Sequence, residues 1–288
     1  MSTNLHSQRE LLSKLQLEAQ GFSGTFGVMA RTLEADPADR LEFGFNQHEI
    51  FPAASVIKLP MLLDALRLVE AGQLRLEQRY QMAATDLASG SGVLQVMQPG
   101  LEPSLRDLLT LMIVVSDNTA TNMVLDILGG VEAINARFAI MGLETIRVVG
   151  KLQVAWEFKT DAQRQGKLAE MTPLETTQLL EKLWRGQLLT SEMQTLALEI
   201  LGAQQYTEIL ERYLPDGIKT ACKSGSITGV RNDVGIVYAA RPYAVALASK
   251  GGSDHREHLD NEGVLLLARV SKLLYDFTQV SGLSVSGS

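Results

Sequence analysis

A serine and a lysine in the first quarter of the chain have the spacing that covalent catalysis needs. Ser55 and Lys58 stand three residues apart, and side chains at that spacing share one face of a helix. A serine hydroxyl is a weak nucleophile, and a lysine amine with a lowered pKa can be the base that activates it. The pair therefore predicts acylation of Ser55 by an amide or ester. Taken alone, it also fits an N-cap serine and a solvated lysine.

A second polar string, Ser116-Asp117-Asn118, follows a strongly apolar segment. Ser116 could relay a proton to a leaving group. Asn118 could bind a substrate amide and hold Lys58. Asp117 is the best candidate for the N-cap of the next helix, a role that needs no catalysis.

A third string, Lys223-Ser224-Gly225, lies on a predicted strand. Lys223 would be a cationic dock for an acylating substrate and would be the second cation that lowers the pKa of the first lysine. Gly225 allows a ligand to approach the strand closely. The backbone N–H of Ser226, with that of Ser55, could donate to a developing oxyanion.

Composition narrows the class of protein. With 288 residues, 45% of them hydrophobic, the chain can form one large domain or two lobes. A net charge of −7 argues against a nucleic-acid or anionic-membrane partner. The single cysteine excludes an intrachain disulfide, and strand alternation turns Cys222 away from Lys223, which favours a buried hydrophobic role. The four histidines lack metal-ligand spacing and no phosphate loop is present, so neither a metal nor a cofactor is expected.

The N-terminus carries no basic segment followed by an apolar one, and no apolar run is long enough to span a bilayer. As written, the chain is expected in the cytoplasm. A chain trimmed of its leader would look the same, and would then be periplasmic or secreted.

Hydrophobic periodicity predicts strands and helices in separate blocks. Strand patterns occur at 24–33, with a hairpin partner at 40–45, and again at 219–226, 232–240 and 243–249. Helix patterns occur at 8–19, 55–70, 104–115, 118–128, 131–141, 172–184 and 257–277, with two shorter helices within 191–213. Pro60 is expected to distort the helix at 55–70.

This order predicts an α+β fold, in which an antiparallel sheet is flanked by the N- and C-terminal helices and an all-α lobe is inserted. We expect a single catalytic domain, 1–288, of two lobes. The α/β lobe would comprise about 1–50 and 215–288, and the all-α lobe about 51–214.

The three strings together resemble those of the penicillin-recognising serine hydrolases, most closely the class A β-lactamases. The resemblance covers about residues 22–278. It includes 116–122, Gly129-Gly130, Met141-Gly142, Thr172-Pro173 and 228–233. It implies an all-α lobe packed on an α/β lobe, with the site in the cleft.

The resemblance also implies a role for each residue. Ser55 is then the acylated nucleophile, Lys58 its base and Ser116 the proton shuttle. Asn118 contacts substrate. The carboxylate dock is formed by Lys223 and Ser224, assisted by Arg231.

The chain departs from the family at one point. The family's deacylating glutamate follows the Met-Gly pair in an Arg-x-x-x-x-Glu setting. When the family's pattern is aligned without gaps from Met141-Gly142, Arg147 takes the place of its arginine and Leu152 takes the place of its glutamate. The nearest glutamate, Glu157, is five residues later, and a shifted loop could bring it in as the deacylation base.

Three functions follow from these residues. The leading one is a β-lactamase that works through an acyl-enzyme, with slow deacylation if no base is present. The second is an esterase or D-Ala-D-Ala peptidase, which the missing glutamate favours. The third is a penicillin-binding sensor that is acylated once. Each takes a small carboxylate-bearing amide or ester as its partner, and the sequence does not give an oligomeric state.

Overall fold

The computed structural model describes residues 2–34, 36 and 39–280, which form two compact units. The sheet unit comprises Met1–Phe51, Thr172–Glu181 and Thr207–Ser288, and the helical unit comprises Pro52–Met171 and Lys182–Tyr206. Residues 172–181 thus belong with the sheet, although the sequence-based boundary gave them to the all-α lobe. The reason is local, since Thr177 Oγ1 donates to the carbonyl of Met29 at 3.2 Å and Arg31 pairs with Glu181 at 2.7 Å.

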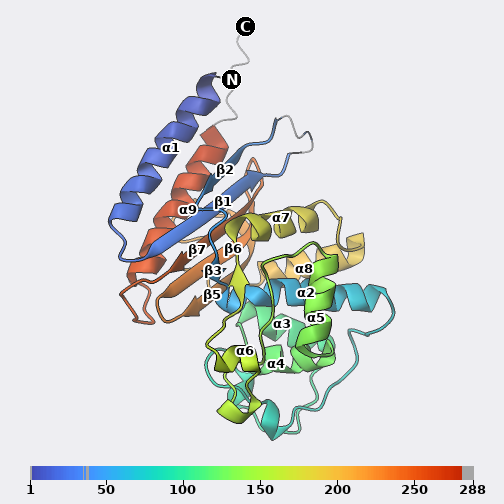
Figure 1. The fold of residues 1–288 in the computed structure, drawn as a ribbon. Coiled ribbons are helices and arrows are strands. Elements are labelled where there is room, and N and C mark those ends of the chain that lie inside the picture. Colours follow the sequence, from blue (N-terminus) through green and yellow to red (C-terminus); the bar gives the residue numbers. More distant parts are fainter. Residues whose placement is uncertain (1, 35, 37–38, 281–288) are drawn as a thin grey trace. The chain divides into compact units, whose positions relative to one another are not determined.

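The sheet unit is built on five antiparallel strands in the order β2-β1-β7-β6-β5. Figure 1 shows the two terminal helices running side by side along this sheet. This is the predicted antiparallel sheet with flanking helices. Its elements are α1 (Ser2–Gln20), β1 (Thr25–Thr32), β2 (Glu42–Phe45), β5 (Lys219–Ile227), β6 (Val230–Tyr238), β7 (Tyr243–Lys250) and α9 (Glu262–Val280).

One apolar core joins the sheet to these two helices. Strand residues such as Val28, Val245 and Leu247 are fully buried and belong to the same cluster as Leu15 of α1 and Leu274 of α9. Burial of each such side chain contributes about 1.5–3 kcal/mol to folding, so the strands of this unit are held rigidly.

The helical unit contains the middle of the chain. Its helices are α2 (Lys58–Glu70), α3 (Leu105–Val114), α4 (Asn118–Ile127), α5 (Gly130–Ile140), α6 (Asp161–Arg164) and α8 (Ser191–Gly202). The predicted second helix within 191–213 is wrong, because the chain after Gly202 turns instead. Two short strands, β3 (Phe51–Pro52) and β4 (Glu170–Met171), pair with each other, and α7 spans Pro173–Trp184.

The start of α2 corrects a second expectation. A 3₁₀ turn, Ala54–Ile57, precedes the α-helix, which begins only at Lys58. Pro60 is therefore in the first helical turn, where a backbone N–H has no intrahelical acceptor. Pro60 therefore does not have to distort the α-helix, because the 3₁₀ turn before Lys58 moves the start of the helix close to the proline.

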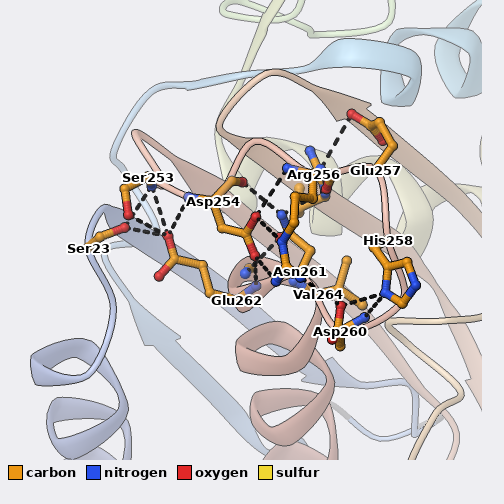
Figure 2. A network of polar contacts seen from close by, with 12 residues as sticks. Ser23, Ser253, Asp254, Arg256, Glu257, His258, Asp260, Asn261, Glu262 and Val264 are labelled. Atoms are coloured by element: carbon orange, nitrogen blue, oxygen red, sulfur yellow. Dashed lines mark hydrogen bonds and ion pairs between the residues drawn. The ribbon is translucent and has the colours of Figure 1, made fainter.

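The last helix begins later than predicted, at Glu262. Figure 2 shows why: the loop before it is cross-linked by polar side chains, with Glu262 bonded to Ser253 and Asn261 bonded within the loop. Asn261 accepts from the N–H of Gly263 and of Val264, at 2.9 and 3.4 Å. Its side chain thus caps the helix start. Within the described residues, no helix is long and apolar enough to cross a membrane.

Candidate active site

The side chain of Lys58 is the centre of a polar cluster in the helical unit. Lys58 is fully buried as the first residue of α2. Its Nζ donates to the carbonyl oxygen of Ser116 at 2.7 Å, to Ser116 Oγ at 3.0 Å and to Asn118 Oδ1 at 2.9 Å. The structure therefore brings together Lys58, Ser116 and Asn118, as the sequence predicts, and a proton can pass directly between the amine and the Ser116 hydroxyl.

Ser55 lies on the 3₁₀ turn that leads into Lys58 and is half-buried. The carbonyl of Ser55 accepts from the N–H of Lys58, which fixes the two residues one turn apart. Ala54, just before Ser55, has φ 47°, and Ser116 has φ 52°. A non-glycine residue in this left-handed region costs about 1–2 kcal/mol, and such strain gathers at functional sites. The nucleophilic role of Ser55 stays a prediction.

Asp117 has the structural role that the sequence predicts. Its Oδ1 accepts from the N–H of Ala120 as the N-cap of α4, at 2.9 Å. Its Oδ2 accepts from the N–H groups of Val93 and Leu94, at 2.7 and 2.8 Å. A Cβ added at Gly92 would lie 2.3 Å from Asp117. Asp117 thus holds a neighbouring loop, and glycine is required for the close approach.

Sequence reasoning missed that neighbouring loop. The carbonyl of Ser91 accepts from the N–H of Asn118 at 3.0 Å, and the carbonyl of Ser89 accepts from Asn118 Nδ2 at 2.9 Å. Asn118 is thereby oriented with its Oδ1 toward Lys58. The signal in the sequence was Ser-Gly-Ser-Gly at 89–92, which by itself indicates only a turn.

Leu152 is held against α4 by its backbone. Asn122 donates to the carbonyl of Leu152 at 2.9 Å and accepts from its N–H at 2.7 Å. Asn122 is one helical turn after Asn118, on the same face of α4. The exposed Glu157 lies on a separate 3₁₀ turn, Trp156–Phe158. These two hydrogen bonds tie Leu152 to the helix that carries Asn118.

Lys223 in the sheet unit is also fully buried. Its Nζ donates to the carbonyl of Ser224 at 2.8 Å. Burial lowers the pKa of Lys223 to about 8, and the negative charge of Asp233 opposes that shift. Lys223 therefore carries its charge at neutral pH and loses it under mildly alkaline conditions. That it lies beside Lys58 stays a prediction.

The other predicted site residues of β5 come directly after Lys223 and pair with residues of β6. Ser224 is half-buried, Gly225 is buried and Ser226 is exposed, and they pair with Asp233, Asn232 and Arg231. Adjacent side chains on a strand point to opposite faces. Cys222, on the face away from Lys223, is 1% exposed in the apolar core, which confirms its expected role.

Arg231 is buried and mainly contacts backbone carbonyls. Its guanidinium donates to the carbonyls of Ile227, Val230 and Arg256, at 2.9, 2.8 and 2.8 Å, and more weakly to Glu257 at 3.4 Å. These contacts connect β6 to the loop of Figure 2. They give Arg231 a structural role, and its assistance to the carboxylate dock stays a prediction.

Asp233 is a buried carboxylate with incomplete pairing. Its Oδ2 accepts from the N–H of Leu210 at 3.0 Å, while Oδ1 has no hydrogen-bond partner among the described residues. Burial raises the pKa of Asp233 to about 7. The charges of Lys223, Glu208 and Glu211 act on the same group, the first lowering and the other two raising its pKa.

This pKa predicts a pH-dependent stability. The ordinary pKa of aspartate is 3.8, and the folded value is about 7. Between those values the folded state binds more protons than the unfolded one, so the free energy of unfolding falls as the pH rises. Asp233→Asn removes this titration. The measurement is urea unfolding of both proteins at pH 4.5 and at pH 7.5. Between these two pH values the free energy of unfolding of the variant, relative to that of the wild type, is expected to rise by more than about 1.4 kcal/mol, which corresponds to one pKa unit. Parallel stability curves would contradict the assignment.

The α+β architecture, with terminal helices on an antiparallel sheet, is that of β-lactamases and related penicillin-binding proteins. The structure has a TM-score of 0.81 with a β-lactamase from Sphaerobacter thermophilus, at 29% identity over 94% of this chain and 97% of that one. It has a TM-score of 0.80 with PBP-A, at 27% identity over 94% and 95% of the two chains. A leucine-to-glutamate variant of PBP-A, solved as an acyl-enzyme complex with penicillin G, has the same TM-score of 0.80.

Residues 10–278 match the model of the Beta-lactamase enzyme family, and the chain belongs to that family. Among curated relatives, it is 23% identical to β-lactamase BRO-1 of Moraxella catarrhalis, over 94% of this chain and 85% of that protein. It is 33% identical to β-lactamase L2 of Stenotrophomonas maltophilia over 119 residues, which are 41% of this chain and 38% of that protein. Within the described residues, no cluster of three or more histidine, cysteine or acidic side chains could hold a metal ion.

Proposed function

We propose that this chain is a serine hydrolase that forms an acyl-enzyme with β-lactams and releases it slowly. The observation that carries the proposal is the buried amine of Lys58, bonded to Ser116 and Asn118 and one turn after Ser55. A buried amine with a hydroxyl at hydrogen-bond distance is the proton-transfer arrangement that acylation of a serine needs.

Each proton transfer in the proposed acylation of Ser55 has a donor and an acceptor. In this step Lys58 is a neutral amine. Ser55 Oγ attacks the lactam carbonyl carbon and gives its proton to the Lys58 amine, while the carbonyl oxygen becomes an oxyanion. The N–H groups of Ser55 and Ser226 stabilise that oxyanion. As the ring C–N bond breaks, Ser116 Oγ gives a proton to the leaving nitrogen and regains one from Lys58. The product is an ester on Ser55.

Substrate binding uses the remaining predicted residues. Lys223 and Ser224 bind the substrate carboxylate, with Arg231 assisting, and Gly225 leaves room against β5. Asn118 binds the substrate's amide. The partner is a small β-lactam or a related amide or ester that carries a carboxylate, and no cofactor is involved in these steps.

Slow release follows from Leu152. Hydrolysis of the ester needs a base that activates water, and the aliphatic side chain of Leu152 cannot accept a proton. A PBP-A variant that is 27% identical to this chain was solved as an acyl-enzyme complex with penicillin G, which supports the acyl-enzyme in this proposal. Glu157, exposed on its own turn, is the less favoured base.

A burst experiment with nitrocefin tests the proposal. Wild-type protein is expected to release about one equivalent of product quickly and then to turn over slowly. Leu152→Glu is expected to raise the slow phase at least about tenfold, since a positioned general base contributes 10²–10⁴-fold at best. Glu157→Gln is the matched control and should leave both phases unchanged. Burst-free turnover near 10 s⁻¹, or a burst created by Glu157→Gln, would contradict slow release.

A second candidate function is a D-Ala-D-Ala peptidase or esterase. Leu152 favours it, because a peptidase or esterase has no need to hydrolyse a β-lactam ester quickly. Assays with D-Ala-D-Ala peptides and p-nitrophenyl esters separate the two functions. Turnover of a peptide or ester faster than of any lactam would favour the peptidase or esterase. Acylation without turnover of any substrate would indicate the penicillin-binding sensor.

A further inference from the structure

Large apolar side chains are exposed close together in one loop of the helical unit. In the segment 147–168, the side chains of Trp156, Phe158 and Leu168 are 62%, 67% and 48% exposed. Single exposed apolar side chains are normal on a protein surface, whereas a group of them marks a contact site. In Figure 1 this segment is the yellow-green loop around α6. It is named the aromatic loop below.

Hydrogen bonds hold the aromatic loop in place without using the rings. Gln163 Nε2 donates to the carbonyl of Lys151 at 2.7 Å. The Arg164 guanidinium donates to the carbonyl of Glu157 at 3.2 Å, which ties α6 to the 3₁₀ turn that carries the two rings. The polar groups of the loop are therefore bonded within the protein, while its rings are exposed to solvent.

The aromatic loop is basic, although the whole chain is acidic. It contains five cationic and two acidic side chains, whereas the net charge of the 288 residues is −7. The charged residues are Arg147, Lys151, Lys159, Arg164 and Lys167, with Glu157 and Asp161. The surface of this loop therefore has the opposite sign of charge to the rest of the protein.

Two lysines of the loop have no carboxylate partner within the described part of the chain. Lys167 is exposed and Lys159 is half-buried. The amine of Lys159 lies 5.6 Å from the centre of the Trp156 ring. Residues three apart lie on the same side of a 3₁₀ turn, so this cation and this ring face the same way.

Exposed rings beside cations fit the surface of an anionic lipid bilayer. Aromatic rings enter the headgroup region, and lysines next to them attract lipid phosphates. A single apolar anchor binds a membrane only marginally and needs a basic patch as a second signal. Because salt screens charges beyond about 8–10 Å, a bilayer that touches the loop is attracted mainly by the loop's own charges.

We propose that the aromatic loop docks the protein on an anionic membrane surface, with Trp156 and Phe158 inserted among the headgroups and Lys159 and Lys167 on lipid phosphates. The expectation drawn from the net charge does not hold for this loop, whose local charge is positive. The docking goes beyond the proposed function and does not depend on acylation of Ser55.

The test is co-sedimentation of the full chain with vesicles of phosphatidylcholine, alone or with an equal amount of phosphatidylglycerol. Wild-type protein is expected to bind the mixed vesicles, more weakly as NaCl is added, and to bind phosphatidylcholine alone far less. Trp156→Ser with Phe158→Ser should lower the partition coefficient at least about tenfold, because two rings no longer leave water. Lys159→Gln with Lys167→Gln should lower it up to about 25-fold, since each lysine near an anionic surface contributes about fivefold.

Two matched controls make the same kinds of change elsewhere. Leu17→Ser with Ile140→Ser removes two apolar side chains that are 70% and 74% exposed. Lys14→Gln with Lys219→Gln removes two exposed lysines. Both control proteins should bind the mixed vesicles as the wild type does, and circular dichroism checks that every variant is folded.

Four results would overturn the membrane docking. They are wild-type protein that does not bind mixed vesicles, equal binding to both kinds of vesicle, loop variants that bind like the wild type, and an equal loss in the controls. Dimerisation in solution that Trp156→Ser with Phe158→Ser removes would also overturn it, because a second copy would then cover the rings. No substrate is present in this experiment, so the acylation of Ser55 is tested separately.

Discussion

Ser55→Ala is expected to abolish covalent capture of β-lactams and of fluorophosphonates. Removing the nucleophile of a serine hydrolase costs about 10⁶-fold in turnover, which places this change beyond the range of a steady-state assay. The reason is local: Ser55 is half-buried on a strained 3₁₀ turn and one turn before a buried amine. Intact-mass analysis with peptide mapping is the measurement.

The control for this experiment is Ser13→Ala. Ser13 is an exposed serine of α1 whose hydroxyl donates to the carbonyl of Arg9, so its loss should leave labelling intact. An adduct on a residue other than Ser55, or undiminished activity in Ser55→Ala, would remove the basis of the proposed function.

Lys58→Ala is expected to slow acylation about 10²–10⁴-fold, the usual contribution of a general base. Lys58→Arg should be nearly as damaging, because a guanidinium keeps its charge but does not release its proton. Stopped-flow nitrocefin acylation is the measurement.

A structural effect must be separated from the loss of a base. Lys58→Ala leaves the acceptors of Ser116 and Asn118 without their buried donor, which destabilises the fold. Rates are therefore compared at a temperature where circular dichroism shows every variant folded. A loss below threefold in Lys58→Ala would rule out its role as the base.

Local chemistry predicted the starts of several helices. Thr172 with Pro173 predicted the start of α7, and Thr172 Oγ1 accepts from the N–H of Glu175. Ser104 and Asp117 cap α3 and α4 in the same way. These predictions succeed because a cap involves residues three apart, whose types alone decide the bond.

Other features depend on partners far along the chain, so periodicity could not find them. The 3₁₀ turn before Lys58 moved the helix start and placed Pro60 in its first turn. The segment 151–153 has no regular pattern, because its conformation is set by Asn122 and Asp126 of α4.

The same distinction holds for the candidate site. Lys58, Ser116 and Asn118 could be named because their types and order match a known chemistry, and the structure brings them together. Gly92 could not be named, because the requirement for a glycine there comes from the Asp117 carboxylate.

The order of strands in the sheet has a consequence for synthesis of the protein. β1 pairs with β7, Val28 opposite Leu247, and these strands lie near opposite ends of the chain. A ribosome that makes this chain therefore releases the whole of the helical unit before β1 can acquire that neighbour. During that interval β1 is paired only with β2. The backbone N–H and C=O groups on its other edge are unpaired and can bind a strand of another chain. This edge of β1 is therefore open to aggregation until β7 emerges.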